Sequence, residues 1–258
     1  MSGSIDISLG EVAASLVLVA VAIVASRWRG AGLERDIGVA VARSFVQLTA
    51  IGLVITFIFE QDSAVFVIAL LAVMVGFGAL TARHRAVGVP GALGPLLIAL
   101  SVAAIGTLGL VLLLGIIEPE PRFVVPVGGM VIGNAMTAAA VALNRLGEDV
   151  AGDARRIEAT LALGATSSQA VAPLVRRSLR SGMITLVDST KTTGLIFFPG
   201  TMVGMLLAGA DPVDAVRLQL ILLYTLLGSV AIAALLATTL ARRNFFTPAH
   251  QLREPPQP

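Results

Sequence analysis

Residues 144–181 read NRLGEDVAGDARRIEATLALGATSSQAVAPLVRRSLRS, a long polar insert between two apolar runs. The insert contains six arginines and four acidic residues. Charged side chains are costly inside a lipid bilayer, so a segment of this kind lies in water on one side of the membrane. We therefore expect an integral membrane protein in which apolar spans flank one main water-exposed segment.

The composition of the whole chain supports this class. Of its 258 residues, 56% are hydrophobic and 13% are charged, whereas charged residues make up about 25% of a typical soluble domain. The absence of cysteine excludes disulfides and thiolate metal sites. Lys191 is the only lysine, and it does not end a GxxxxGK[ST] loop. We therefore expect no ATPase activity and no cofactor in this chain.

Apolar runs of about 20 residues are long enough to cross a bilayer as helices. Seven such runs predict an all-α polytopic membrane protein with a single transmembrane domain over residues 1–258. The tail at residues 247–258 is expected to be disordered, because it is polar and rich in proline. The seven expected spans are Leu9–Ser26, Ile37–Phe59, Ala64–Leu80, Leu93–Ile117, Phe123–Leu143, one within Met183–Ala210, and Ala215–Ala241.

The arginines outside these spans fall on alternate loops. Fourteen lie in the set of loops that includes the insert and the tail, and only Arg122 and Arg217 lie in the other set. Cytoplasmic loops of membrane proteins are enriched in Lys and Arg. We expect the N-terminus outside and the insert and C-terminus in the cytoplasm. The same alternation accounts for the pI of about 9.9 without a nucleic-acid partner.

The centre of the insert, Ala154–Ala165, has the pattern of a short amphipathic helix. Asp153 is a plausible N-cap, and Gly164 is a plausible stop. Such a helix either lies among lipid headgroups or presents a compact apolar knob to a groove on a partner. Periodicity alone leaves both alternatives open.

Several motifs resemble one family of permeases. Glu158-Ala159-Thr160-x3-Gly164 is similar to the EAA-x3-G loop by which permease subunits of ATP-binding-cassette (ABC) transporters engage their ATPase subunits, with Thr160 in place of the second alanine. The hydrophobic-Leu-Pro ending of that motif is absent after Leu174. Four further motifs are Arg43-x3-Gln47-Leu48, Gly133-Asn134-Ala135-Met136, Leu161-Ala162-Leu163-Gly164-Ala165-Thr166, and the run from Asp188-Ser189-Thr190-Lys191 through Pro199-Gly200-Thr201-Met202 to Gly204.

Together the motifs, from about Arg35 to Ala241, resemble the FetB-type (YbbM-like) permease family, bacterial membrane proteins assigned to iron export and related to plant proteins linked to aluminium tolerance. The resemblance implies a permease subunit in a bacterial plasma membrane, a homodimer that pairs with a separate ATPase subunit. That partner would bind the ATP, and the substrate would be a metal cation, with iron expected. The partner-coupling residues would be Glu158, Ala159, Leu163, Gly164 and Ala165.

Polar residues within the spans are candidates for the transport pathway. Arg43 and Gln47 are one helical turn apart and share a face of the second span. They serve either as structural residues, with Arg43 reaching the interface, or as lining residues. Asn134, in the fifth span, is a further candidate for a polar contact.

The sixth span carries the remaining candidates. Asp188 and Lys191 are spaced to pair on one helix face. They form either a local ion pair or a cation ligand with its counter-charge at the cytoplasmic mouth, and Asp188 is the candidate metal ligand. Pro199-Gly200 is expected to break the helix. Met202 carries a thioether that suits soft metals, although methionine also fills apolar gaps.

Two other functions remain open from the sequence. An ion-coupled secondary transporter would use Asp188 as its titratable coupling residue. A membrane scaffold that transports nothing would need only the insert, which would recruit a soluble protein.

Overall fold

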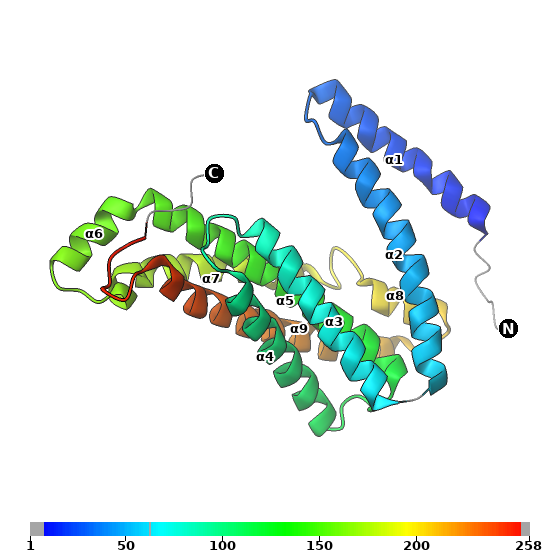
Figure 1. Ribbon diagram of the computed structural model, residues 1–258. Helices are drawn as coiled ribbons and strands as arrows, with labels where there is room; N and C mark the ends of the chain where they lie inside the picture. Colours follow the sequence, from blue (N-terminus) through cyan, green and yellow to red (C-terminus); the bar gives the residue numbers. More distant parts are fainter. Residues whose placement is uncertain (1–7, 62, 254–258) are drawn as a thin grey trace. The chain divides into compact units, whose positions relative to one another are not determined.

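The computed structural model describes residues 8–61 and 63–253, and these residues are mainly α-helical (Figure 1). The chain folds as two compact units, Met1–Asp62 and Ser63–Pro258.

The first unit is a pair of long apolar helices, α1 (Leu9–Arg29) and α2 (Glu34–Gln61). Ser8 caps α1 through a reciprocal capping box with Glu11. The turn between the helices is held by Ser26, whose hydroxyl donates to the Glu34 carboxylate at 3.1 Å and accepts the Leu33 N–H at 3.1 Å. The two helices therefore form a hairpin.

The second unit is a bundle centred on α5, which packs against α3, α4, α7 and α9. The polar residues of the insert thus fold as part of the bundle. The elements of the second unit are α3 (Ala64–Arg85), α4 (Leu93–Leu113), α5 (Pro121–Gly152), α6 (Ala154–Ala162), α7 (Ser167–Thr192), α8 (Gly200–Leu207), α9 (Pro212–Ala241) and the short 3₁₀ helix η1 (Arg242–Phe245).

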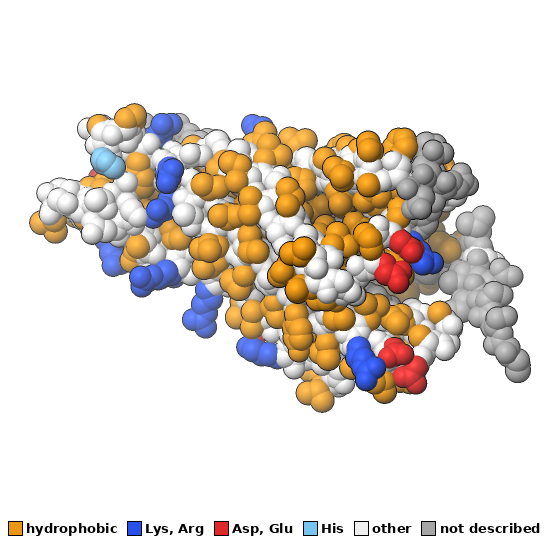
Figure 2. Space-filling view, turned by 90° about the horizontal axis from the view of Figure 1, so that it is seen from below, with side chains coloured by type: hydrophobic (Ala, Val, Ile, Leu, Met, Phe, Trp, Pro, Cys, Tyr) orange, Lys and Arg blue, Asp and Glu red, His pale blue; other side chains and the backbone are white. Residues whose placement is uncertain are grey.

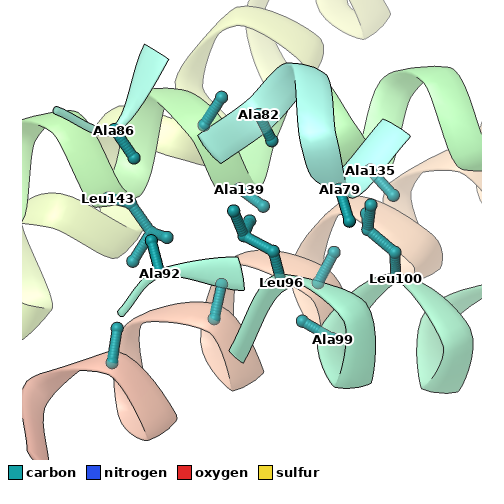
Figure 3. Close-up of a cluster of buried hydrophobic side chains, with 14 of the residues drawn as sticks. Ala79, Ala82, Ala86, Ala92, Leu96, Ala99, Leu100, Ala135, Ala139 and Leu143 are labelled. Atoms are coloured by element: carbon teal, nitrogen blue, oxygen red, sulfur yellow. The ribbon is translucent and has the colours of Figure 1, made fainter. Parts of the chain in front are cut away.

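Small side chains line the contacts between these helices. Ala79 of α3, Leu96 and Ala99 of α4, and Ala135 and Ala139 of α5 are completely buried and lie against one another (Figure 3). Small residues let helix backbones approach closely, which is how helices pack where lipid gives no hydrophobic drive. The bundle is thus held by close backbone packing.

Among the described glycines, the closest approach to a neighbouring backbone joins α7 to α5 at Gly182. A Cβ added there would lie 2.6 Å from the carbonyl oxygen of Ala138 and 2.9 Å from the Cβ of Ala142. Only glycine fits at this distance. The crossing fixes where the second half of α7 lies against the middle of α5.

Six of the described helices are long and apolar enough to cross a membrane, namely α1, α2, α3, α4, α5 and α9. The span expected within Met183–Ala210 is not one helix, because α7 ends at Thr192 and α8 begins at Gly200. The count of seven spans and the orientation of the termini stay predictions.

The insert at 144–181 differs from the expected loop. Its first part continues α5 to Gly152, and its last part is the beginning of α7. Leu146, Val150, Val171 and Leu174 are buried in the core, so their helices are amphipathic. The helix expected at Ala154–Ala165 is confirmed as α6, although it ends earlier, at Ala162.

Hydrophobic side chains cover much of the visible face, while Lys and Arg gather towards the end that carries α6 (Figure 2). Large apolar residues are exposed on several helices, including Leu53 at 72%, Phe77 at 68% and Ile105 at 74%. Exposure to water would cost about 25 cal/mol per Å² of apolar surface, whereas lipid covers it at no such cost. The chain is therefore a multi-pass membrane protein.

Candidate functional site

The helix α6 projects from the bundle on a single buried anchor. Ile157 is 2% exposed and belongs to the main hydrophobic core, and Leu161 packs against that core. Asp153 occupies the N-cap position, but its side chain caps no N–H. The first turn of α7 is secured instead by Thr166, which forms a capping box with Gln169. The rest of α6 is therefore free to present its outer face.

The predicted partner-coupling residues lie on α6 and in the turn that follows it. Glu158, Ala159 and Gly164 are exposed, Ala165 is half-buried, and Leu163 is 89% exposed. Gly164 has a φ of +91°, a conformation that residues with a Cβ rarely adopt, so it ends α6 as predicted. The segment thus offers a small apolar tip flanked by a carboxylate.

A C-terminal strap, residues 246–253, folds back against the beginning of α7. The N–H of Thr247 donates to the carbonyl of Gln251 at 2.9 Å, and Phe246 pairs with Leu252 in an antiparallel bridge. The strap is part of the tail that the sequence predicts to be disordered, and the rest of that tail, 254–258, lies outside the described residues.

Two side-chain contacts join the C-terminal region to the start of α7. The Nδ1 of His250 lies 3.1 Å from the Ser167 hydroxyl, and the Arg242 guanidinium donates to the Ser168 hydroxyl. Between the strap and α6 lies a pocket of about 550 Å³. It is lined by Glu158, Leu161, Ala165, Ala249, His250, Gln251 and Leu252.

The second candidate region is the far end of α7. The Lys191 Nζ lies 3.0 Å from the Asp188 Oδ1, so the pair forms as its spacing predicts. The side chains of Lys191 and Asp188 are 67% and 58% exposed, respectively. Among the described residues, no group of three or more His, Asp or Glu side chains is arranged to hold a metal. Asp188 is therefore not part of a preformed group of three such ligands among the described residues.

The length of α7 places this pair deeper than the sequence suggests. Because α7 begins at Ser167, Asp188 is about 32 Å along the helix from its start, at 1.5 Å per residue. Asp188 is about 9 Å beyond the Gly182 contact with Ala138, which is itself about 26 Å from Pro121 at the start of α5. The pair thus lies about 17 Å from the level of Pro121, which is near the middle of a hydrocarbon core about 30 Å thick when Pro121 is taken as the edge of that core.

The chain leaves its helical path just after this pair. Residues 193–199 form a loop in which the Gly194 N–H donates to the Phe197 carbonyl at 2.9 Å. Pro199 is the N-cap of α8, so Pro199 and Gly200 mark the beginning of α8, whereas α7 has already ended at Thr192. The preceding Leu195 is 89% exposed and Ile196 is 79% exposed.

The other predicted pathway residues are spread over both units. Met202 is 9% exposed, and the neighbouring Thr201 hydroxyl lies 4.0 Å from the Met130 sulfur. Asn134 is half-buried, and its Nδ2 donates to the Met130 carbonyl at 2.8 Å. Arg43 and Gln47 are exposed on α2 in the first unit. Within the second unit, α5, α7 and α8 thus carry the candidates.

Comparison with known proteins identifies the family. The model of the uncharacterised protein family UPF0014 matches residues 9–246. The chain belongs to the UPF0014 family. No solved structure matches it.

Three relatives of this UPF0014 protein have names that bear on its class. It is 39% identical to the UPF0014 membrane protein STAR2 of Oryza sativa subsp. japonica, over 93% of this chain and 85% of the relative. It is 38% identical to Protein ALUMINUM SENSITIVE 3 of Arabidopsis thaliana, over 93% and 88%. It is 37% identical to the Probable iron export permease protein FetB of Escherichia coli, over 96% and 95%. The predicted resemblance to FetB-type permeases is therefore confirmed.

Sequence reasoning missed the C-terminal strap of this UPF0014 chain and placed Gln219 only as a weaker candidate for a polar pathway contact than Asn134. The strap was hidden by its polar composition, and only the apolar pair Phe245-Phe246, which is buried, signals that the tail is anchored. Gln219 of α9 is 7% exposed, and its Oε1 has no hydrogen-bond partner among the described residues. The sequence marks Gln219 as a polar residue within an apolar span, but only the packing of α9 shows that it is buried.

Proposed function

We propose that this chain is the permease subunit of an ABC exporter that moves a metal cation, with iron as the expected substrate. ATP is bound and hydrolysed by a separate ATPase subunit that docks on α6, and two copies of the chain form the pathway. The chain itself carries no cofactor and no catalytic residue.

The observation that carries the proposal is the exposure of α6. Its only fully buried residue is Ile157, whereas Glu158, Ala159, Leu163 and Gly164 of the EAA-like segment are exposed. A segment held out in this way can enter a groove on a partner. Because binding sites couple reciprocally, ATP binding in the partner would bias the permease, and substrate in the permease would bias the ATPase.

The Asp188–Lys191 pair supports a pathway along α7. Charged side chains at mid-membrane depth almost always face a water-filled cavity or another protein segment. The pair is exposed in one copy of the chain, so water or a second copy is the environment that fits it. One relative, FetB of E. coli, is named as a probable iron export permease. A polar lining of this kind suits the export of a metal cation.

The docking step is tested by Gly164→Val. Valine cannot readily adopt the φ of +91°, so the turn after α6 must rearrange. Co-purification with the ABC ATPase subunit of the proposed transporter should be lost, while the amount of protein in the membrane stays the same. The matched control is Gly152→Val, at an exposed α5 position with no atom within 4 Å of the added Cβ. Equal co-purification of both variants would refute docking at α6.

The energy source and substrate are tested in inverted membrane vesicles that contain both subunits. Uptake of radioactive iron should require ATP and should survive a protonophore. Uptake that persists without ATP and collapses with the ion gradient would instead favour a secondary transporter. If iron is not taken up under any condition while α6 still binds the ATPase, iron is the wrong substrate.

A further inference from the structure

Glu158 and Leu161 of the EAA-like segment line a pocket, but the segment forms only one side of that pocket. Glu158, Leu161 and Ala165 line one wall, and residues 249–252 of the C-terminal strap line the opposite wall. A partner segment that enters this pocket to reach Glu158 therefore meets the strap. We propose that the strap and α6 form a single docking surface, and that the ATPase subunit inserts a segment between them.

The strap is built as a firm wall. Phe246 is 6% exposed in the core, and Leu252 packs against the same core. The Arg253 N–H donates to the Phe245 carbonyl at 2.8 Å, which closes the strap at its far end. The contact between His250 and Ser167 ties it to the first residue of α7. A wall fixed in this way needs little ordering when a partner binds, which favours affinity.

The chemistry of the pocket indicates what enters it. Leu161 and Leu252 supply apolar surface on opposite walls, and both are half-buried. Glu158 forms no salt bridge with any described residue, although Arg155 and Arg156 are close to it along α6. The fitting occupant is an apolar side chain of the ATPase subunit accompanied by a Lys or Arg that pairs with Glu158.

This inference depends on the proposed docking of an ATPase at α6, and it adds the strap to that interface. The two claims can be separated with single cysteines, because the natural chain has none. Leu163→Cys reports on the tip of the EAA-like segment, and Ala249→Cys reports on the strap. Glu118→Cys, in the loop between α4 and α5, serves as a control at the opposite end of the bundle and has a side chain that is 68% exposed.

Each variant is purified in detergent with and without the ABC ATPase subunit of the proposed transporter, and its rate of labelling by a maleimide is measured. We expect the ATPase to suppress labelling at residues 163 and 249 and to leave residue 118 unchanged. Protection at 163 with unchanged labelling at 249 would overturn the role of the strap and leave docking at α6 intact. Unchanged labelling at both positions would overturn both claims.

A truncation gives an independent measurement. Ending the chain after Thr247 removes the pocket wall at 249–252, whereas ending it after Arg253 keeps the whole strap. The first truncation should weaken binding of the ATPase by about tenfold or more, equivalent to about 1.4 kcal/mol, and the second should not change it. Equal affinities for the two truncated proteins would contradict the proposal, provided that both are recovered from the membrane in equal amounts.

Discussion

Replacing Gly182 by alanine should separate α7 from α5. The added Cβ would lie 2.6 Å from the Ala138 carbonyl oxygen, whereas carbon–oxygen contacts of this kind are about 3.3–3.6 Å. The helix must therefore withdraw by about 0.7 Å, and neither the backbone carbonyl nor the Ala142 Cβ can rotate away. Overpacking of this kind costs about 1–3 kcal/mol.

The control for this change is Gly133→Ala in α5, where no atom lies within 4 Å of the added Cβ. Both variants gain the higher helix propensity of alanine, about 1 kcal/mol, so this gain cancels in the comparison. Gly182→Ala should therefore unfold about 1–3 kcal/mol more easily than Gly133→Ala. The assay is reversible unfolding of the purified protein in SDS, followed by circular dichroism. Equal free energies of unfolding would show that α7 does not press on α5 at this point.

Two further predictions concern the coupling helix and the charged pair. Ile157→Ala removes the buried anchor of α6, a kind of change that costs about 2–5 kcal/mol. Hydrogen exchange should accelerate across Ala154–Ala162 and stay unchanged in the middle of α5. Equal acceleration in both helices would show that Ile157 is not a local anchor. Asp188→Asn should lower iron export while the protein level stays the same, because exposed ion pairs contribute about 0–1 kcal/mol to stability. Full export by Asp188→Asn, with Lys191→Met as its comparison, would remove the pair from the pathway.

The apolar helices could be predicted from sequence because length and composition determine them almost alone. Their ends could not, because α5 and α7 continue as amphipathic helices into polar sequence. Leu146 and Val150 extend the buried face of α5 by one turn each, and Val171 and Leu174 do the same for α7. A count of charges over residues 144–181 does not reveal the helical spacing of these buried residues, whereas the positions of the apolar residues would have indicated it.

The candidate site was predictable where it depends on local chemistry. Gly164 ends α6, and Asp188 pairs with Lys191, because both features are fixed by residues within one helical turn. The pocket beside α6 depends on residues almost a hundred positions apart, which come together only when Phe246 enters the core. No local sequence pattern in the tail predicts that it forms one wall of this pocket.

The uninterrupted course of α7 has a mechanical consequence. Between Ser167 and Thr192 the helix is a single rod that touches α5 most tightly at Gly182. That contact divides the rod into arms of about 22 Å towards Ser167 and about 9 Å towards Asp188. If α7 rocks on this fulcrum, a push of about 5 Å at the long arm displaces the charged pair by about 2 Å in the opposite direction. Such a lever converts a larger displacement near Ser167 into a smaller and stronger one at Asp188.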